Sequence, residues 1–197
     1  MQWSGVMKIL IILGHPAKKR QSLSEALANA YKEGAIESGH EVRLYKVADK
    51  QFDPILHEGY WEEQTAEPDI AEAQERILWA DHLVFVYPLW EYMIPALLKG
   101  FLERTLTRGF AYLERDSQKK GKLLAGKSAR LIQTSGMPAF IYRFWYRAHG
   151  MKALRDLLGF CGIRPVHASC FGRIEAVDDA RRKRWLNEMK ILGSKGR

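Results

Sequence analysis

Short apolar runs alternate with amphipathic segments along most of the chain. Residues 8–14, Lys-Ile-Leu-Ile-Ile-Leu-Gly, form a continuous apolar run that ends at glycine, which is typical of a strand buried on both faces of a parallel sheet. Four further strands are predicted, at 41–45, 82–87, 129–134 and 166–171. Five helices are predicted from helical spacing of apolar residues, at 22–38, 69–80, 95–106, 143–158 and 178–192.

Local signals support the ends of two of these helices. The sequence Ser22-Leu-Ser-Glu25 fits a capping box, and Pro95 stands where proline is well tolerated, in a first helical turn. Because strands alternate with helices, we expect a doubly wound five-stranded parallel sheet with helices on both faces. Nothing resembles a linker between domains, so residues 1–197 are expected to form one α/β domain, with 1–6 as an N-terminal tail.

In such sheets, ligands bind beyond the carboxyl ends of the strands, at the point where the strand order reverses. This rule directs attention to the loops that begin after Gly14, Tyr87 and Thr134. The first leads into a helix N-terminus, whose free amides and dipole suit a phosphate. The second is rich in aromatic side chains, which suit a planar ring or form a hydrophobic plug. The third has small residues that let the backbone approach a ligand.

Composition and charge narrow the picture only slightly. Apolar residues make up 47% of the chain and charged residues 27%, which is typical of a globular protein. The formal net charge of +8 is compatible with binding to nucleic acid, an anionic membrane surface or an acidic small ligand. It is equally compatible with a basic surface that only keeps the protein in solution. No nucleic-acid-binding motif accompanies the basic runs, so nucleic acid is not expected as a partner.

Cellular location and metal binding leave few signals. The longest apolar run near the start is too short to span a bilayer, and neither a signal peptide nor membrane insertion is expected. Cys161 and Cys170 have no metal-binding or redox spacing, and no metal site is predicted. A cytoplasmic location is therefore predicted.

One motif matches the phosphate-binding P-loop letter for letter: Gly121-Lys-Leu-Leu-Ala-Gly-Lys-Ser128. A true P-loop follows a strand and opens a helix. Here a polar excursion, 109–126, covers most of the match and an apolar strand follows it. We therefore interpret Lys127 as the solvated entry to the strand at 129–134.

Three segments together resemble the flavodoxin-like NAD(P)H:quinone oxidoreductase family. The most specific are Pro88-Leu-Trp90, Pro95-Ala-Leu-Leu-Lys-Gly-Phe-Leu-Glu-Arg104 and Gly109-Phe-Ala-Tyr112, with supporting matches at His15 and Phe160-Cys-Gly162. The resemblance extends from Lys8 to about Trp185. It implies a flavodoxin-like fold, a non-covalently bound flavin (FMN or FAD), and hydride transfer from NADH or NADPH to a quinone or similar flat acceptor.

The resemblance also implies the residues of the flavin site. His15, Ser22, Leu23 and Ser24 would hold the phosphate, and Pro88, Leu89, Trp90, Glu91 and Tyr92 would hold the isoalloxazine. Thr134, Ser135 and Gly136 would complete the ring site, and Arg181 matches a segment near the adenosine of FAD. From charge alone, Arg143, Arg147 or Lys152 is a candidate to receive the 2′-phosphate of NADPH.

The catalytic helpers do not carry over directly. The best-known relatives have a Tyr and a His six residues apart beyond the third loop, whereas this chain has Tyr142, Tyr146 and His149 in a differently spaced aromatic segment. These three are the catalytic candidates, and His149 equally fits a surface position on a basic helix. The turn Thr134-Ser-Gly136 also departs from the family's usual Thr-Gly-Gly.

Two alternative functions stay open at this stage. Some relatives are ancillary subunits of potassium-efflux systems, and flavodoxin-type carriers transfer single electrons, although the basic pI of about 9.5 argues against a carrier. Family members are commonly homodimers. The aromatic stretch 140–146 is too apolar to face water comfortably, so it faces either a second subunit or the substrate pocket.

Overall fold

The computed structural model describes residues 5–18, 21–59, 61–113 and 121–197. Residues 1–4 of the predicted tail, 19–20 of the first loop and 114–120 of the polar excursion therefore lie outside the described residues. The strands are all parallel and stand in the order β2-β1-β3-β4-β5. Their bounds are β1 (Lys8–Leu13), β2 (Glu41–Lys46), β3 (His82–Pro88), β4 (Ser128–Thr134) and β5 (Val166–Phe171). The predicted five-stranded parallel sheet is confirmed.

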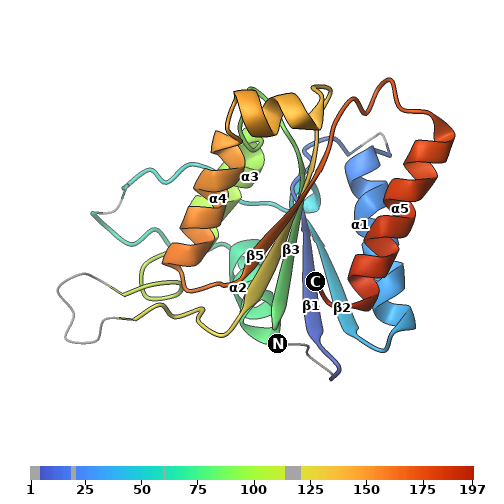
Figure 1. The fold of residues 1–197 in the computed structure, drawn as a ribbon. Coiled ribbons are helices and arrows are strands. Elements are labelled where there is room, and N and C mark those ends of the chain that lie inside the picture. Colours follow the sequence, from blue (N-terminus) through green and yellow to red (C-terminus); the bar gives the residue numbers. More distant parts are fainter. Residues whose placement is uncertain (1–4, 19–20, 60, 114–120) are drawn as a thin grey trace.

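In the described part of the chain, five α-helices cover the two faces of the sheet (Figure 1). On one face lie α1 (Leu23–Glu37) and α5 (Asp179–Ser194). On the other lie α2 (Pro68–Trp79), α3 (Ala96–Thr105) and α4 (His149–Phe160). A 3₁₀ turn, η1 (Val47–Asp49), follows β2. The result is a three-layer arrangement in which the sheet separates two hydrophobic cores.

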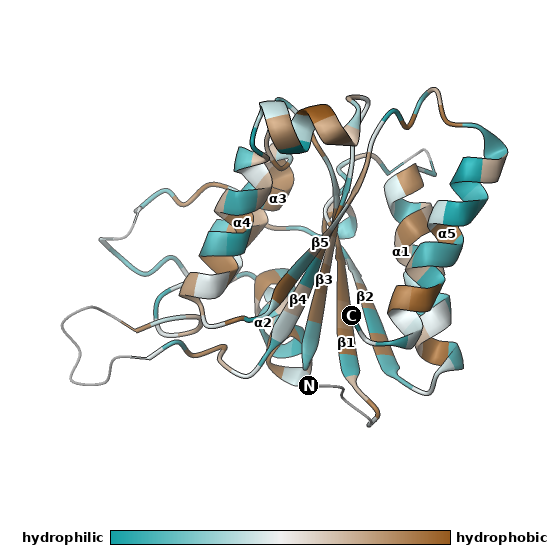
Figure 2. Cartoon of the chain, in the orientation of Figure 1, coloured by the Kyte–Doolittle hydropathy of each residue, from teal (hydrophilic) through white to brown (hydrophobic). Residues whose placement is uncertain are grey.

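The continuous apolar run of β1 follows from this arrangement. Ile9, Ile11 and Leu13 belong to the core beneath α1 and α5, whereas Leu10 and Ile12 belong to the core beneath α2, α3 and α4. Successive strand residues point to opposite faces, so a strand buried on both faces needs an apolar residue at every position. Figure 2 shows the middle of the sheet as hydrophobic and most of α5 as hydrophilic.

Helices α1 and α5 approach each other closely because glycines lie at their contact. A Cβ on Gly34 would stand 1.9 Å from the carbonyl oxygen of Lys190, and one on Gly193 would stand 2.0 Å from that of Tyr31. Both distances are far inside van der Waals contact, so any larger residue would force the helices apart. The contact lies near the C-terminal ends of both helices, whose N-termini face the carboxyl edge of the sheet (Figure 1).

The prediction of one continuous helix at 143–158 is wrong. The structure has a short π-helical segment, η2 (Ile141–Trp145), and then a break before α4 begins at His149. Arg147 and Ala148 form the break with left-handed φ values of 52° and 50°. Non-glycine residues adopt this conformation at a cost of about 1 kcal/mol each. The surrounding packing therefore holds an energetically unfavourable turn here, and apolar spacing alone did not reveal it.

The P-loop match has a structural role in the described chain. Its residues turn into the amino end of β4 rather than opening a helix. The amides of Leu123 and Leu124 donate to the carbonyls of Ala111 and Cys161, so they are not available to a phosphate. The Lys127 ammonium donates to the carbonyl oxygens of Leu78 and Ala80 at the end of α2, and burial lowers its pKa. The prediction that Lys127 lies in solvent is therefore wrong in part.

Within the described ranges, no helix combines the length and the apolar character that crossing a membrane requires.

Candidate functional site

The three loops predicted to form a site meet at the carboxyl edge of β1, β3 and β4. The Leu89 amide donates to the Thr134 carbonyl over 2.7 Å, and the Ser24 hydroxyl bonds the Thr134 hydroxyl over 2.8 Å. The rings of His15 and Trp90 stand edge to face, with centroids 5.9 Å apart. Residues more than 100 positions apart therefore share one small region at the point where the strand order reverses.

The first loop presents donors to this region. Ser22 caps α1, and its hydroxyl accepts from the amide of Glu25 over 3.2 Å. The amides of Leu23 and Ser24 make no hydrogen bond to another described residue. First-turn amides point out of a helix along its positive dipole end, so these two are available to an anion.

His15 adds a side-chain donor beside them. Burial lowers the pKa of His15, although the carboxylate of Glu25 opposes that shift. Its Nδ1 accepts from the amide of Ala17 over 3.1 Å. A neutral ring with an accepting Nδ1 carries its proton on Nε2, so that nitrogen is left as a hydrogen-bond donor.

The second loop is a tight turn with free amides. Trp90 and Met93 exchange backbone hydrogen bonds of 3.0 and 2.8 Å around the turn. Glu91 and Tyr92 adopt left-handed φ values of 46° and 63°, and their amides have no partner among the described residues. Pro88 is buried, Leu89 is half-buried, and Trp90 is exposed to 47%. A strained turn with free donors and an exposed indole is a surface that suits a flat polar ring.

The third loop is held from beneath. The Ser135 amide donates to the Phe171 carbonyl and its hydroxyl donates to the Met137 carbonyl, so its polar groups are already used. The Gly136 amide has no partner among the described residues. A Cβ on Gly136 would meet no atom closer than 3.9 Å, so protein packing does not require glycine there. The open side of Gly136 allows a ligand to approach the backbone.

These features fit a flavin at the predicted residues. A flavin needs donors for its phosphate and for the polar edge of its ring, and both are present as free backbone amides. Arg181 stands apart from this cluster. It is exposed in the first turn of α5, where its guanidinium lies over the ring of Trp185 at 5.4 Å.

The three catalytic candidates occupy different environments. The Tyr142 side chain is buried, its hydroxyl accepts from the Met151 amide over 3.2 Å, and burial raises its pKa. Tyr146 lies against Tyr92 with ring centroids 4.7 Å apart, and the hydrogen bond between them raises the pKa of Tyr92. His149 is exposed at the start of α4. Of the three, Tyr146 is the residue whose ring packs on a residue of the predicted ring site.

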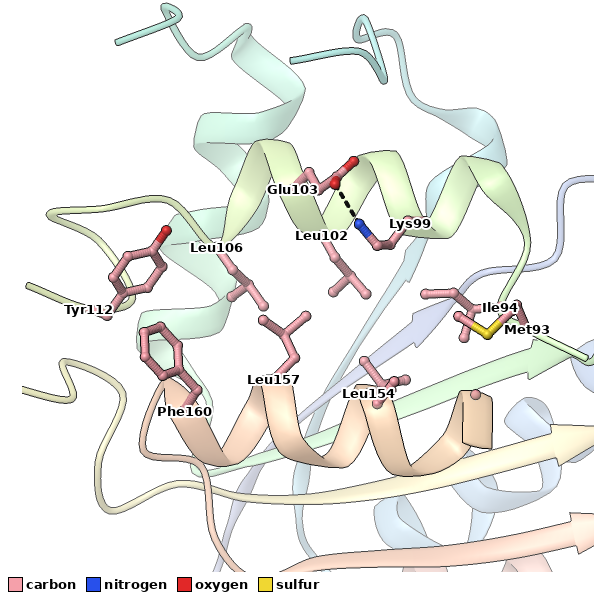
Figure 3. A pocket seen from close by; sticks show the side chains of 12 residues that line it. Met93, Ile94, Lys99, Leu102, Glu103, Leu106, Tyr112, Leu154, Leu157 and Phe160 are labelled. Atoms are coloured by element: carbon pink, nitrogen blue, oxygen red, sulfur yellow. Dashed lines mark hydrogen bonds and ion pairs between the residues drawn. The ribbon is translucent and has the colours of Figure 1, made fainter. Parts of the chain in front are cut away.

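Among the described residues, two of the cavities lie beside these loops. One of about 320 Å³ lies between α3 and α4 and is lined mainly by apolar side chains such as Leu102, Leu154 and Leu157 (Figure 3). It begins at Met93, where the second loop ends, and Tyr112 and Phe160 lie at its far end. The ion pair of Lys99 with Glu103 lies beside it.

The second cavity, of about 270 Å³, contains residues that sequence reasoning missed. The three cations singled out from charge, Arg143, Arg147 and Lys152, all line it, together with Phe144, Arg155 and Cys170. The helical spacing of 152 and 155 was the available signal for Arg155. The approach of Cys170 on β5 depends on the tertiary fold and has no sequence signature.

Comparison with known proteins decides the family. Residues 7–190 match the model of a family described by its flavodoxin-like fold. The chain belongs to this family. An uncharacterised NAD(P)H oxidoreductase of Haemophilus influenzae is 35% identical over 90% of this chain and 89% of its own length. The expected relationship to these oxidoreductases is confirmed.

The names of two other relatives include the word quinone. An NAD(P)H dehydrogenase [quinone] 1 of Cavia porcellus is 31% identical over 68% of this chain, which spans 55% of that longer protein. The solved NAD(P)H:quinone oxidoreductase of Methanothermobacter marburgensis is 27% identical, covers 96% of both chains and superposes with a TM-score of 0.80. The solved structure therefore shares the fold described above.

Proposed function

We propose that this chain is a flavin-dependent NAD(P)H oxidoreductase that transfers two electrons to a quinone or a similar flat acceptor. The observation that carries the proposal is the convergence of unpartnered backbone amides from three loops at the point where the strand order reverses. The names of its relatives support oxidoreduction by NAD(P)H over an ancillary transport role. A flavin bound here supplies the hydride chemistry.

The residues divide between the two ends of the cofactor. The amides of Leu23 and Ser24, with the Nε2 proton of His15, bind the phosphate, and the Ser22 cap keeps that helix end in place. The amides of Glu91, Tyr92 and Gly136 would hold the polar edge of the ring, since free donors of this kind stabilise negative charge. Pro88, Leu89 and Trp90 form the wall of the ring site, and Thr134 and Ser135 support it. Arg181 is available to an adenosine if the flavin is FAD.

Tyr146 is the residue best placed to assist hydride transfer. Its ring packs on Tyr92 beside the free amides of the second loop. The Tyr146 side chain is exposed, so its hydroxyl can hold or donate a proton at the surface of the ring site while it bonds that of Tyr92, whereas the Tyr142 hydroxyl is buried and accepts from the Met151 amide. The side chain of Tyr142 therefore positions η2 against α4.

The test is whether the purified chain binds flavin and turns over. We expect yellow protein, FMN or FAD in the heat-released supernatant by chromatography, and NAD(P)H oxidation that depends on added quinone. Colourless protein that neither flavin reconstitutes would contradict the proposal. Isolated chain that holds flavin but turns over only with a membrane transporter would indicate an ancillary subunit instead.

A matched pair of caps tests the phosphate site. Ser22→Ala and Asp178→Ala each remove a helix cap, since Asp178 accepts from the Arg181 amide as Ser22 does from Glu25. Each should cost about 1 kcal/mol of stability in urea unfolding. Only Ser22→Ala should weaken FMN in a fluorescence titration, by about fivefold, because only that helix end faces the phosphate. Equal FMN affinities would place the phosphate elsewhere.

Assembly as a homodimer in the cytoplasm completes the proposal. Phe140 and Trp145 are exposed to 65% and 82%. A second subunit would cover such apolar surface. Free Cys161 and Cys170 suit a reducing compartment. Light scattering after size exclusion should give twice the chain mass, and a monomer would remove the dimer from the proposal.

A further inference from the structure

The cavity beside the candidate site is strongly basic. Four cationic side chains line its rim: Arg143 from η2, Arg147 from the left-handed break, and Lys152 and Arg155 from α4. No carboxylate lines it among the described residues. None of these four cations makes an ion pair with a described residue, whereas Lys46, Lys50, Arg76 and Arg104 elsewhere all do. The positive charge of the four cavity residues is therefore left for a ligand.

The inner surface of this basic cavity is apolar and partly aromatic. Ala148 and Met151 are buried there, and Ala168 and Cys170 of β5 form the floor. Cys170 is close enough to Arg143 and Arg155 for both charges to act on its pKa, although burial raises that pKa overall. Phe144, which is 79% exposed, adds an aromatic face at the edge. Cations beside an exposed ring suit a phosphorylated nucleoside.

The basic cavity adjoins the proposed hydride-transfer site through one short segment. Tyr146 packs on Tyr92 of the ring site, and the next residue, Arg147, lines the cavity. The left-handed turn at Arg147 and Ala148 reverses the chain between the two. A dinucleotide with its nicotinamide near Tyr146 therefore has a basic cavity within reach of its other end.

We propose that this basic cavity binds the 2′-phosphate of NADPH and makes the enzyme prefer NADPH to NADH; the proposal rests on the proposed function. The chemistry separates the two dinucleotides. In dinucleotide-binding sites, a carboxylate that accepts a hydrogen bond from the ribose 2′-hydroxyl selects NADH. An arginine that binds the 2′-phosphate selects NADPH. This cavity has three arginines and a lysine and no carboxylate among its described lining residues. A phosphate monoester carries nearly two negative charges at neutral pH, which matches that excess.

Direct binding tests the proposal without turnover. Calorimetry on the full chain should show 2′,5′-ADP binding at least about tenfold more tightly than 5′-AMP, because only the former carries the 2′-phosphate. Arg147→Gln and Arg155→Gln, which lie on different elements, should each weaken 2′,5′-ADP by about tenfold and leave 5′-AMP unchanged. Lys183→Gln removes one charge from exposed α5 on the other face and should change neither affinity. Equal affinities of the two nucleotides in the unmodified chain would overturn the proposal.

Steady-state kinetics with a soluble quinone gives the second readout. Both arginine variants should raise the KM for NADPH by about tenfold, with kcat and the KM for NADH unchanged. A parallel rise in both KM values would assign these cations to the pyrophosphate that the two dinucleotides share, and would overturn the proposal.

The two proposals fail in different ways. If the chain binds no flavin and has no activity, the proposed function fails, and calorimetry with 2′,5′-ADP alone decides the phosphate site. Circular dichroism and thermal melting confirm that each variant folds. If Arg147→Gln unfolds because of its strained backbone, Arg155→Gln in the middle of α4 provides the same test.

Discussion

Helix α3 and the segment 140–148 both contain residues singled out by sequence, yet they differ in what those residues do. Gly100 and Arg104 belong to the motif that carried the family resemblance most specifically. A Cβ on Gly100 would stand 2.4 Å from the carbonyl oxygen of Pro54, and the buried Arg104 donates to the Thr65 carbonyl and pairs with Glu67. Both residues hold Pro54, Thr65 and Glu67 against α3.

Segment 140–148 has the opposite character. Its backbone is strained at Arg147 and Ala148, and most of its aromatic and basic side chains are exposed. Such features cost stability and are expected where a protein binds ligands. The comparison teaches that a specific family motif can report packing, while the residues proposed to assist this chain's chemistry lie outside that motif.

The largest effect that tests this comparison is on stability. Arg104→Leu should lower the free energy of unfolding by about 3 kcal/mol, because it breaks a buried ion pair and leaves the Thr65 carbonyl without its donor. The KM for NADPH should stay within about twofold in the folded variant. Urea unfolding and steady-state kinetics measure the two quantities.

The control for Arg104 is on the same helix. Lys99→Gln removes an exposed pair with Glu103 and should cost less than about 0.5 kcal/mol. If Lys99→Gln and Arg104→Leu lower stability equally, burial is not what makes the motif important.

A smaller effect should separate the two tyrosines of the second region. Tyr146→Phe should lower kcat by about a hundredfold, since loss of a positioned proton donor or acceptor typically costs at least that much. Tyr142→Phe should leave kcat within about twofold but cost about 1 kcal/mol of stability, because the Met151 amide loses its acceptor. Stopped-flow reduction and urea unfolding check both. The opposite pattern would move the catalytic role to Tyr142.

The smallest expected effect is the change in unfolding free energy per pH unit that the buried His82 contributes. Burial at the start of β3 lowers the pKa of His82 to about 3. Between pH 6.5 and that value the unfolded chain binds a proton that the folded chain does not. Stability should therefore fall by about 1.4 kcal/mol for each pH unit of acidification from this residue alone.

His82→Gln isolates that contribution. Glutamine does not titrate and can still bond the Ser128 hydroxyl, which His82 Nδ1 contacts at 2.7 Å. Its unfolding free energy should fall less steeply between pH 6.5 and 4.5 than that of the unmodified chain. Equal slopes in urea titrations would mean that the buried ring does become protonated in the folded state.

Much of the fold was predictable because burial on both faces leaves a strong sequence pattern. The predicted strand at 166–171 matches β5, and the helix predicted at 22–38 contains α1 with the Ser22 cap in place. The exception was 143–158, where apolar spacing continues across the break at Arg147 and Ala148 with neither glycine nor proline to mark it. Tertiary packing imposes that turn.

The candidate site was predictable in place but not in detail. The rule for open parallel sheets located the three loops, and the resemblance named residues in them. Neither the rule nor the resemblance could show that Ser135 is already bonded within the protein, that Tyr142 is buried or that Arg155 lines the basic cavity. These facts depend on side-chain directions and on contacts between distant segments.

The most direct test of the central claim is anaerobic mixing of the flavin-loaded chain with NADPH. We predict stoichiometric bleaching of the visible flavin absorbance without added acceptor, and its recovery when a quinone is added. Protein that holds flavin but stays fully oxidised with excess NADPH or NADH would contradict the account.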